Sequence, residues 1–381
     1  MKITLIGTLP PLKALSPYCF HLAKALSKKV DLNFISFKEI APESYYLGGT
    51  KEKKIFKIRE FSYDEALSWN NPISWIRTGI KFSGNILHVQ HWAIYSSLAY
   101  CFILPIAKIR NKKILVTIHN ITPHTERFLD KFINKIFNKF IFPFADAYIV
   151  HNVRNKKKLL ELYKIDEGKI HILTHGTIYP YQQIKGISKN DSRKKLNINK
   201  DKKVVLFFGY VWDYKGLDHL LNSLKNVRKE IPNILLIIAG ESLKDWQKYE
   251  KIIGKNNLEE HVRRELHYIP DSEIEYYFSS SDLVACPYKK HPFDTHGGVG
   301  ALALSFAKPM IVTDVGGLPE YVKDKKVIAN PNDSEDLAKK IILVLSDESF
   351  AKKLSKDSEE LSKNLSWDKI ADKTINVYEK L

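Results

Sequence analysis

The run Gly297–Gly300 (GGVG) follows the apolar segment Leu283–Pro287 after a loop and opens a predicted helix. Glycine lets backbone amides approach a ligand closely, and the positive end of a helix dipole favours an anion such as a phosphate. The pattern Gly298-x-Gly300-x-x-Ala303 also imitates a dinucleotide fingerprint, but it stands late in the chain rather than at a first strand-to-helix turn. Two interpretations remain open: a diphosphate-binding turn, or a tight turn that needs glycine for its geometry.

A lysine occupies the loop after another predicted strand. Lys203–Gly209 ends in glycine, and Lys215 precedes the predicted helix Leu217–Glu230. A lysine in such a loop is able to reach an anion held above the edge of the sheet. Lysines are abundant in this chain, so Lys215 alone does not distinguish an anion site from a solvated surface residue.

Histidines stand at the ends of two further predicted strands. His91 follows Ile86–Gln90, and His119 ends Ile114–His119, with His124 close behind. The carboxyl ends of parallel strands aim side chains at the ligand-binding edge of a sheet, although a histidine there is as often a structural residue. No predicted helix has His-x-x-x-His spacing and no Asp-x-Asp pair occurs, so we expect no metal.

The first predicted strand, Lys2–Gly7, runs into a loop of glycine, proline and small residues. Ser16 and Pro17 then precede the predicted helix Tyr18–Ser27 as a cap and a first-turn proline. This loop is longer than most strand-to-helix connections, which favours a binding role over a plain connection.

These candidate residues depend on elements that gather strand ends at one edge. Apolar β-rich runs alternate with helical patterns, which predicts an α/β fold of two Rossmann-like parallel-sheet domains. The polar stretch Pro180–Lys202 predicts a linker. We therefore expect an N-terminal domain at 1–182, a C-terminal domain at 183–365, and a helix at 366–381 that packs back across the boundary. The remaining predicted strands are Asp31–Ser36, Ala147–His151, Ile170–Leu173, Ile234–Ala239, Arg264–Tyr268, Met310–Thr313 and Val327–Ala329, and the remaining predicted helices are Asp271–Ser279 and Gly300–Ala307.

Composition narrows the class of partner and compartment. The 381 residues carry a net charge of +17, which favours an anionic partner: a phosphorylated small molecule, an anionic lipid or a nucleic acid. The three scattered cysteines lack C-x-x-C spacing, and the chain begins with a strand rather than a signal-peptide pattern, so we expect a cytoplasmic protein. The longest nearly apolar stretch, Ile94–Ala107, is too short to span a bilayer.

Taken together, the motifs resemble the group 1 (family 4) glycosyltransferases with the two-domain GT-B fold. The similar segments are the N-terminal loop, T-x-H-N-x-x-P-H at 117–124, F-G-x(5)-K-G at 208–216, and the most specific, AKPMIVTDVGGLPE at 307–320. The resemblance covers nearly the whole chain in order. It implies a hexosyltransferase that moves a sugar from a nucleotide-diphosphate donor to a glycan or lipid-linked acceptor in a cleft between facing domains. It further implies retention of configuration without a metal or cofactor, with a UDP-sugar as the favoured donor and a GDP-sugar as the alternative.

The same resemblance gives roles to individual residues. The donor diphosphate would be held by a lysine and by amides at the glycine turn, and the nucleobase by backbone after a strand. One N-terminal loop would close over donor and acceptor. The residues are Lys215, Gly297, Gly298 and Val299 for the diphosphate; Tyr268 and Ile269 for the base; His119 and Asp294 for catalysis; Gly7, Ala14 and Leu15 in the loop; and His91, Trp92 and His124 on the acceptor side.

Three positions depart from the family pattern. The family commonly has two glutamates eight positions apart, and here these positions are Asp294 and Leu302. Tyr210 stands where an arginine usually accompanies the lysine. A second hypothesis is therefore a catalytically inactive homologue that binds a nucleotide sugar. A third, a basic nucleic-acid-binding protein, lacks a recognisable reader motif.

The segment Arg127–Phe142 carries apolar residues at helical spacing, spread over roughly 220° of the helix. Lys131, Lys135 and Lys139 recur four residues apart beside them. One interpretation is a helix buried on both sides. The other is a helix that docks on an anionic membrane surface, which would place the protein peripherally on the inner face of the membrane and favour a lipid-linked acceptor.

Overall fold

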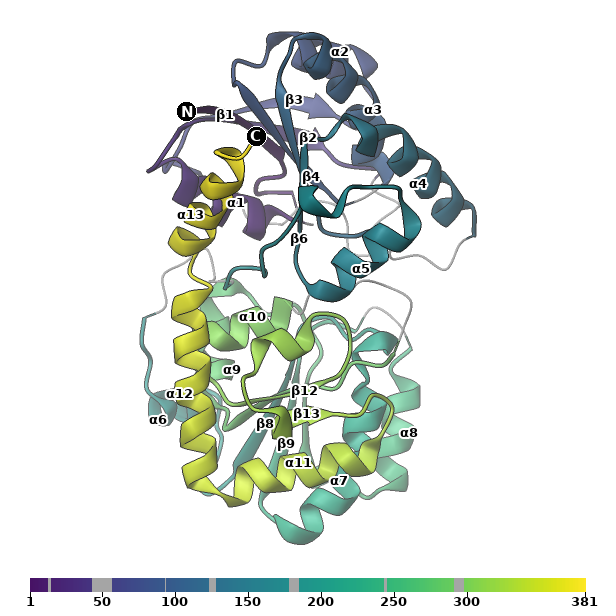
Figure 1. Cartoon of the computed structure of the whole chain (residues 1–381). Helices are drawn as coiled ribbons and strands as arrows, with labels where there is room; N and C mark the ends of the chain where they lie inside the picture. The colour runs from purple at the N-terminus through teal and green to yellow at the C-terminus, as the bar shows by residue number, and fades with distance from the viewer. Residues whose placement is uncertain are drawn as a thin grey trace. The chain divides into compact units, whose positions relative to one another are not determined.

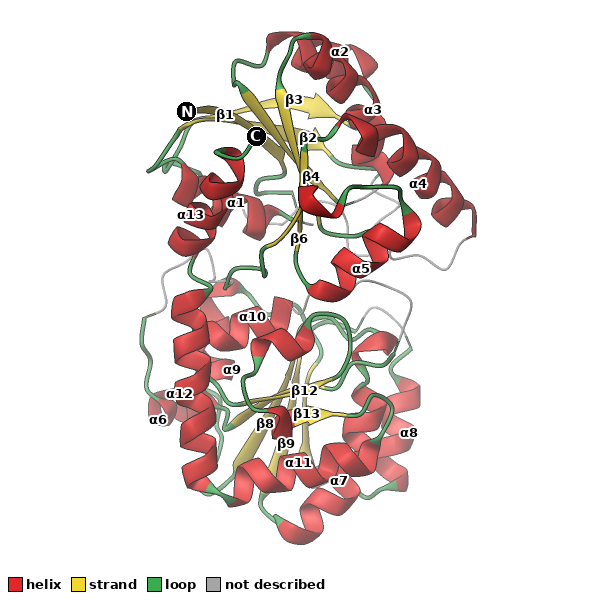
Figure 2. Ribbon diagram, in the orientation of Figure 1, coloured by secondary structure: helices red, strands yellow, loops and turns green. Residues whose placement is uncertain are grey.

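The computed structural model describes residues 1–12, 15–42, 57–92, 94–122, 128–177, 185–242, 245–290 and 298–381. The chain forms two compact units: unit 1 is Met1–Gly176 with Ser366–Leu381, and unit 2 is Thr177–Leu365. Each unit contains one β-sheet with helices packed around it (Figures 1 and 2). The predicted class, two Rossmann-like parallel-sheet domains, is confirmed.

Unit 1 has a seven-stranded parallel sheet in the order β3-β2-β1-β4-β5-β6-β7. The order of the strands reverses between β1 and β4, which is the point where ligands of open α/β sheets bind. The strands are β1 (Lys2–Gly7), β2 (Asp31–Glu39), β3 (Tyr63–Ser68), β4 (Ile86–His91), β5 (Lys113–Ile118), β6 (Ala147–Val150) and β7 (Ile170–Ile172). The helices are α1 (Ser16–Leu26), α2 (Pro72–Lys81), α3 (Ile94–Ile109), α4 (Phe128–Ile141), α5 (Val153–Leu162) and the C-terminal α13 (Trp367–Tyr378), which packs beside α1.

Unit 2 has a six-stranded parallel sheet in the order β10-β9-β8-β11-β12-β13, and its order reverses between β8 and β11. The strands are β8 (Lys203–Phe208), β9 (Ile234–Ala239), β10 (Val262–Glu265), β11 (Leu283–Cys286), β12 (Met310–Thr313) and β13 (Ile328–Ala329). The helices are α6 (Lys189–Lys195), α7 (Leu217–Glu230), α8 (Gln247–Lys255), α9 (Asp271–Ser280), α10 (Gly298–Ser305), α11 (Ser334–Ser346) and α12 (Glu348–Asn364).

The central strands are continuous apolar runs because helices cover both faces of each sheet. β1 (KITLIG) and β9 (ILLIIA) have the predicted bounds and are almost wholly buried. The edge strand β3 was not predicted: the first half of its sequence YDEALS is exposed, and its pairing with β2 is interrupted by register shifts. Polar side chains are tolerated there because only one neighbour and one face constrain an edge strand.

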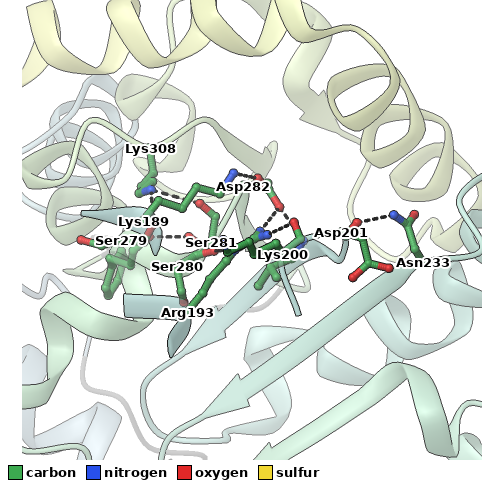
Figure 3. A network of polar contacts seen from close by, with 12 residues as sticks. Lys189, Arg193, Lys200, Asp201, Asn233, Ser279, Ser280, Ser281, Asp282 and Lys308 are labelled. Atoms are coloured by element: carbon green, nitrogen blue, oxygen red, sulfur yellow. Dashed lines mark hydrogen bonds and ion pairs between the residues drawn. The ribbon is translucent and has the colours of Figure 1, made fainter. Parts of the chain in front are cut away.

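Part of the predicted linker is a helix. Within 180–202, α6 places Arg193 in a buried polar network at the start of β11 (Figure 3). The guanidinium of Arg193 donates to Asp282 at 2.9 Å and to the carbonyl oxygen of Ser280 at 3.1 Å. Asp282 also accepts from the backbone N–H of Val204 at 2.7 Å, so one carboxylate joins α6 to the first residues of β8 and β11.

Helix α4 is buried on one side only, so the interpretation of a helix buried on both sides is wrong. Its inward face includes polar residues: Asn134 and Asn138 are buried beside Ile141 and donate to the carbonyl oxygen of Ile121. Its outward face is apolar, with Leu129, Phe132, Ile136 and Phe140 exposed. Among the described residues, no helix is long and apolar enough to cross a membrane.

Candidate active site

In unit 2 the lysine predicted to bind the diphosphate lies beside the reversal point of the sheet. Lys215 ends a short 3-10 turn after β8, and its ammonium group donates to the carbonyl oxygen of Phe208 at 3.4 Å. A methyl group on Gly209 would lie 2.9 Å from the Lys215 nitrogen and 3.7 Å from a methyl carbon of Val299 in the first turn of α10. The structure therefore brings together two residues of the predicted diphosphate site, Lys215 and Val299, across the β8–β11 boundary.

Two glycines make this approach feasible. Gly209 and Gly216 both have left-handed backbone angles, with φ of +84° and +71°. A Cβ on Gly216 would lie 1.9 Å from the carbonyl oxygen of Pro287, so no larger residue fits while the loops keep these positions. The backbone N–H of Lys289 donates to the carbonyl oxygen of Tyr214 at 2.8 Å, which ties the loop after β8 to the loop after β11.

The electrostatics distinguish Lys215 from its neighbour Lys289. Lys289 forms ion pairs with Asp218 at 2.8 Å and Asp213 at 3.2 Å, and these bonds raise its pKa although burial opposes them. Lys215 is buried, and burial lowers its pKa to about 8. Within the described part of the chain, no carboxylate lies within ion-pair distance of Lys215. A desolvated ammonium group of this kind is suited to an anionic ligand.

The glycine turn before α10 is only partly described. Gly298 begins the helix and is exposed, whereas Gly297 and Asp294 lie outside the described residues. Gly300 faces the ring of Tyr321, where a Cβ would lie 2.8 Å from a ring carbon, so this glycine serves helix packing. The binding of a phosphate by Gly298 and Val299 stays a prediction, and Gly300 illustrates the competing role of glycine in close packing.

The two residues predicted at the nucleobase follow β10. The side chain of Tyr268 is half-exposed, whereas Ile269 is buried in the apolar core beside Ile274 and Phe278. Ile269 therefore has only its backbone to offer a base, which is the kind of contact predicted for this segment. The loss of the second family glutamate is also visible, because Leu302 packs into the same core.

In unit 1 the candidate catalytic histidine lies at the carboxyl end of β5, where its strand position predicts it. Both ring nitrogens of His119 have partners: Nε2 lies 2.8 Å from the amide oxygen of Gln90, and Nδ1 lies 3.0 Å from Nε2 of His151. The edge of the Tyr18 ring packs against it with ring centroids 4.5 Å apart. His119 is therefore a buried, well-held residue, and its proposed role in catalysis depends on that fixed position.

The acceptor-side candidates are His91, which ends β4, and Trp92, which follows it, and both are buried. His91 Nε2 lies 3.1 Å from the hydroxyl of Ser97, and Trp92 packs edge-on against Phe37 in the core. The indole N–H of Trp92 has no hydrogen-bond partner among the described residues. The third candidate, His124, lies outside the described part of the chain.

The N-terminal loop is described on both sides of residues 13–14. Gly7 ends β1 against α1, where a Cβ would lie 2.7 Å from the sulfur of Cys19, so glycine is needed for close helix-to-strand packing. Leu15 precedes α1 as its N-cap residue and packs against the core. Ser16, predicted as the cap, is the first residue of the helix. Ala14 lies outside the described residues.

Sequence reasoning missed the partners of His119. Gln90, His151 and Tyr18 are buried within contact distance of it, and none was predicted as a site residue. A signal was present, because three consecutive strands of the sheet, β4, β5 and β6, each end in or run directly into histidine. The described residues contain no group of three or more histidines, cysteines or carboxylates placed to hold a metal ion.

Comparisons with known proteins agree with this architecture. Residues 188–361 match the family model described as "Glycosyl transferases group 1". The resemblance predicted from the sequence is confirmed, because these residues match the group 1 model and the curated relatives include glycosyltransferases. An uncharacterized glycosyltransferase of Methanocaldococcus jannaschii is 26% identical over 229 residues, which cover 58% of this chain and 57% of that protein. The chain spans about half the length of the curated relatives it matches.

Solved structures resemble the chain over its whole length. Sucrose-phosphate synthase from Thermosynechococcus elongatus gives a TM-score of 0.73 at 19% identity and covers 100% of this chain and 98% of its own. HepE from Anabaena, solved in complex with UDP, also gives 0.73, at 15% identity and 100% coverage of both chains. At such identities the likeness establishes the fold, and the chain has the predicted GT-B architecture.

Proposed function

We propose that this protein is a glycosyltransferase that moves a sugar from a nucleotide-diphosphate donor to a glycan or lipid-linked acceptor. The observation that carries the proposal is the buried ammonium group of Lys215, held beside Gly209 and Val299 at the reversal point of the unit 2 sheet. A diphosphate would supply the negative charge that this group lacks among the described residues. UDP is the favoured nucleotide, because a protein of the same fold has been solved with UDP.

The proposed reaction proceeds with retention of configuration and without a metal, as the family resemblance implies. The bond between the anomeric carbon and the diphosphate oxygen breaks, the acceptor oxygen forms the new bond on the same face, and the leaving phosphate takes the acceptor proton. Lys215 stabilises charge that develops on the leaving group. Catalysis of this kind consists largely of positioning and electrostatic stabilisation.

The test combines binding with turnover. A nucleotide sugar that binds only the folded protein raises its melting temperature by mass action, so a thermal-shift panel identifies the donor. Lys215→Ala should then lower turnover on the order of a hundredfold, since loss of one such contact costs roughly 3 kcal/mol. Normal turnover in Lys215→Ala would remove this site from the proposal, and loss of activity in a strong chelator, restored by a divalent ion, would remove the metal-independent mechanism.

The second candidate function is a catalytically inactive donor-binding homologue, which the apolar surroundings of Leu302 favour. The same panel separates the two. Donor binding with neither hydrolysis nor transfer to any acceptor supports the inactive homologue. Turnover that drops in His119→Ala more than donor affinity does supports the enzyme, and unchanged activity in that variant makes His119 a structural residue.

The finer part of the proposal concerns a membrane surface. The exposed row on α4 consists of Leu129, Phe132, Ile136 and Phe140, and lysines border it on one side. Helix α3 packs against α4 and α2 packs against α3 (Figure 1), and these two helices also carry exposed apolar residues: Phe102, Ile109, Ile73, Ile76 and Ile80.

Helices α2 and α3 contain no Asp or Glu and α4 contains one, Asp130, so the three helices together carry a net positive charge beside their exposed apolar residues. An anionic bilayer offers both hydrocarbon and phosphate to such a face. Peripheral docking there would bring the protein to a lipid-linked acceptor.

Sedimentation with liposomes that contain anionic lipid tests the docking face. Changing Lys131, Lys135 and Lys139 to Glu should weaken binding by at least about a hundredfold, because each lost lysine costs about 1 kcal/mol near the surface and each new glutamate is repelled by the anionic lipid. The matched control changes three exposed lysines of unit 2, Lys225, Lys229 and Lys255, to Glu and alters net charge equally. Equal binding by both folded triple variants, or no binding by the wild type at low salt, would exclude α4 as the docking element.

A further inference from the structure

A continuous chain of hydrogen-bonded groups crosses the buried strand ends of unit 1. It starts at the hydroxyl of Tyr378 on α13 and ends at a backbone carbonyl that follows β7. The links are Tyr378 Oη to His88 Nδ1 at 2.7 Å, His88 Nε2 to the Gln90 amide at 3.0 Å, the Gln90 amide to His119 Nε2 at 2.8 Å, His119 Nδ1 to His151 Nε2 at 3.0 Å, and His151 Nδ1 to the carbonyl oxygen of Leu173 at 2.9 Å.

The carbonyl end of this chain determines where each proton lies. A carbonyl oxygen only accepts, so His151 carries its proton on Nδ1. A neutral imidazole has a single N–H, so Nε2 of His151 accepts and Nδ1 of His119 donates to it. Nε2 of His119 is then left as an acceptor, and it needs a donor from Gln90.

Gln90 supplies that donor when its amide group faces His119 with nitrogen rather than oxygen. The two ends of an amide have the same shape, so the hydrogen-bond network decides their orientation. The amide oxygen of Gln90 then accepts from Nε2–H of His88, and the hydroxyl oxygen of Thr117, 2.7 Å from the same nitrogen, shares this proton. Nδ1 of His88 accepts from the Tyr378 hydroxyl. Every group is neutral and every donor points towards Leu173.

The opposite direction is disfavoured. It would set the lone pair of His151 Nδ1 against the carbonyl oxygen of Leu173 at 2.9 Å, or require a buried imidazolium. The protonation states of the outer members agree with the neutral chain. Burial lowers the pKa of His88 to about 3 and raises the pKa of Tyr378 well above its usual value.

We infer that this chain of hydrogen bonds positions His119, holds it as the Nδ1–H tautomer, and couples that tautomer to the C-terminal helix α13. His151 and Gln90 act directly on His119, and Tyr378 acts through His88. A second contact supports the coupling, because Trp367 of α13 packs edge-on against Tyr18, which packs edge-on against His119. The role of His119 in sugar transfer rests on the proposed function, whereas the inferred tautomer does not depend on it.

The first experiment measures turnover and donor KM in Tyr378→Phe, which removes only the hydroxyl at the start of the chain. We expect a roughly threefold to tenfold lower kcat with an unchanged KM, the effect of one lost neutral hydrogen bond. The control is Tyr148→Phe. The buried hydroxyl of Tyr148 donates to the carbonyl oxygen of Phe142 and is not part of the hydrogen-bonded chain. Equal kcat in the two variants would overturn the link to α13.

The second experiment replaces the anchoring histidine. His151→Leu should lower kcat on the order of a hundredfold, because a small misplacement of a catalytic group has effects of this size. His151→Gln should restore most of the rate, since its amide oxygen can accept from His119. Equal loss in both variants would contradict a role as hydrogen-bond acceptor.

Nuclear magnetic resonance of protein labelled with ¹⁵N-histidine reads the tautomer without any turnover. We expect the His119 proton on Nδ1 in the wild type, and a mixture of tautomers in His151→Leu. A proton on Nε2 in the wild type would refute the inferred direction of the chain. If His119 of the wild type is the Nδ1–H tautomer but the protein transfers no sugar, the proposed function is wrong and the inferred direction of the hydrogen bonds is still correct.

Discussion

The ammonium nitrogen of Lys215 lies so close to Gly209 that a methyl group on the glycine would stand 2.9 Å from it. Gly209 also has a φ of +84°, a conformation that other residues adopt only with strain. The glycine that ends β8 thus provides both the turn and the space for the lysine. The F-G-x(5)-K-G spacing in the sequence places Gly209 and Lys215 at the distance along the chain that this contact requires.

Gly209→Ala should lose stability and donor affinity together. The left-handed backbone costs roughly 1–2 kcal/mol for a residue with a side chain, and the new methyl group displaces Lys215. Gly186→Ala is the matched control, because Gly186 has a φ of +72° but no atom of the described residues within 4 Å of the added Cβ. Urea denaturation should show similar destabilisation of both variants, while calorimetry should show weaker donor binding only for Gly209→Ala. Equal donor binding by the two variants would mean that Lys215 can move without loss.

The pKa of Lys215 predicts a pH limit on donor binding. Burial lowers this pKa to about 8, so the free protein carries the charge below that pH and loses it above. The affinity for an anionic donor should therefore be flat below about pH 8 and fall up to about tenfold per pH unit above it. In Lys215→Met the affinity should be lower and independent of pH across this window.

A second buried lysine is a control for this pH effect. Burial also lowers the pKa of Lys308 to about 8, but its ammonium group donates to the carbonyl oxygens of Ser279 and Ser281 at the end of α9. Lys308→Met should reduce stability and leave the pH dependence of donor affinity in place. If Lys308→Met abolished that dependence, its assignment to Lys215 would be wrong.

Asp282 should contribute more to stability than any exposed carboxylate of unit 2. It accepts from buried Arg193, from Lys189 and from the backbone of Val204 (Figure 3), so Asp282→Asn leaves a buried guanidinium without its counter-charge. Removing one partner of a buried pair costs about 3–5 kcal/mol. Urea denaturation should show this loss, whereas exposed Asp201→Asn should change the unfolding free energy by less than about 0.5 kcal/mol. A small effect in both variants would mean that water replaces the lost contact.

The sequence predicts the buried strands well because their apolar runs leave little choice of structure. β1, β9 and β12 have the predicted bounds, and the other predicted strands are displaced by a few residues at most. Helix α6 could not be predicted from the sequence, because its residues KNDSRKK form no apolar stripe. Its position depends on the contact between Arg193 and Asp282, which lie 89 residues apart in the sequence.

The candidate site also has a part that the sequence predicts and a part that it does not. Lys215 and Val299 could be predicted because local motifs place them at strand-to-helix turns. The hydrogen-bonded chain around His119 could not be predicted, since its members come from five segments and their order follows from strand register and from the position of α13. Helix α4 shows a further limit: an apolar stripe indicates an amphipathic helix, but the structure was needed to show that Asn134 and Asn138 lie on the buried face and most of the stripe on the exposed one.

Restoring the missing family glutamate as Leu302→Glu should destabilise the protein without improving donor binding. Leu302 is 7% exposed and packs in the apolar cluster with Ile274 and Phe278, so a carboxylate there loses hydration without gaining a partner. Burial raises the pKa of such a carboxyl group, so the variant is least destabilised below about pH 4.3 and loses stability as the pH rises. Leu302→Gln is the uncharged control, and at pH 7 we expect it to unfold at a higher urea concentration than Leu302→Glu. A gain in donor affinity by Leu302→Glu at unchanged stability would instead show that position 302 faces the ribose, and that the family contact was lost by substitution alone.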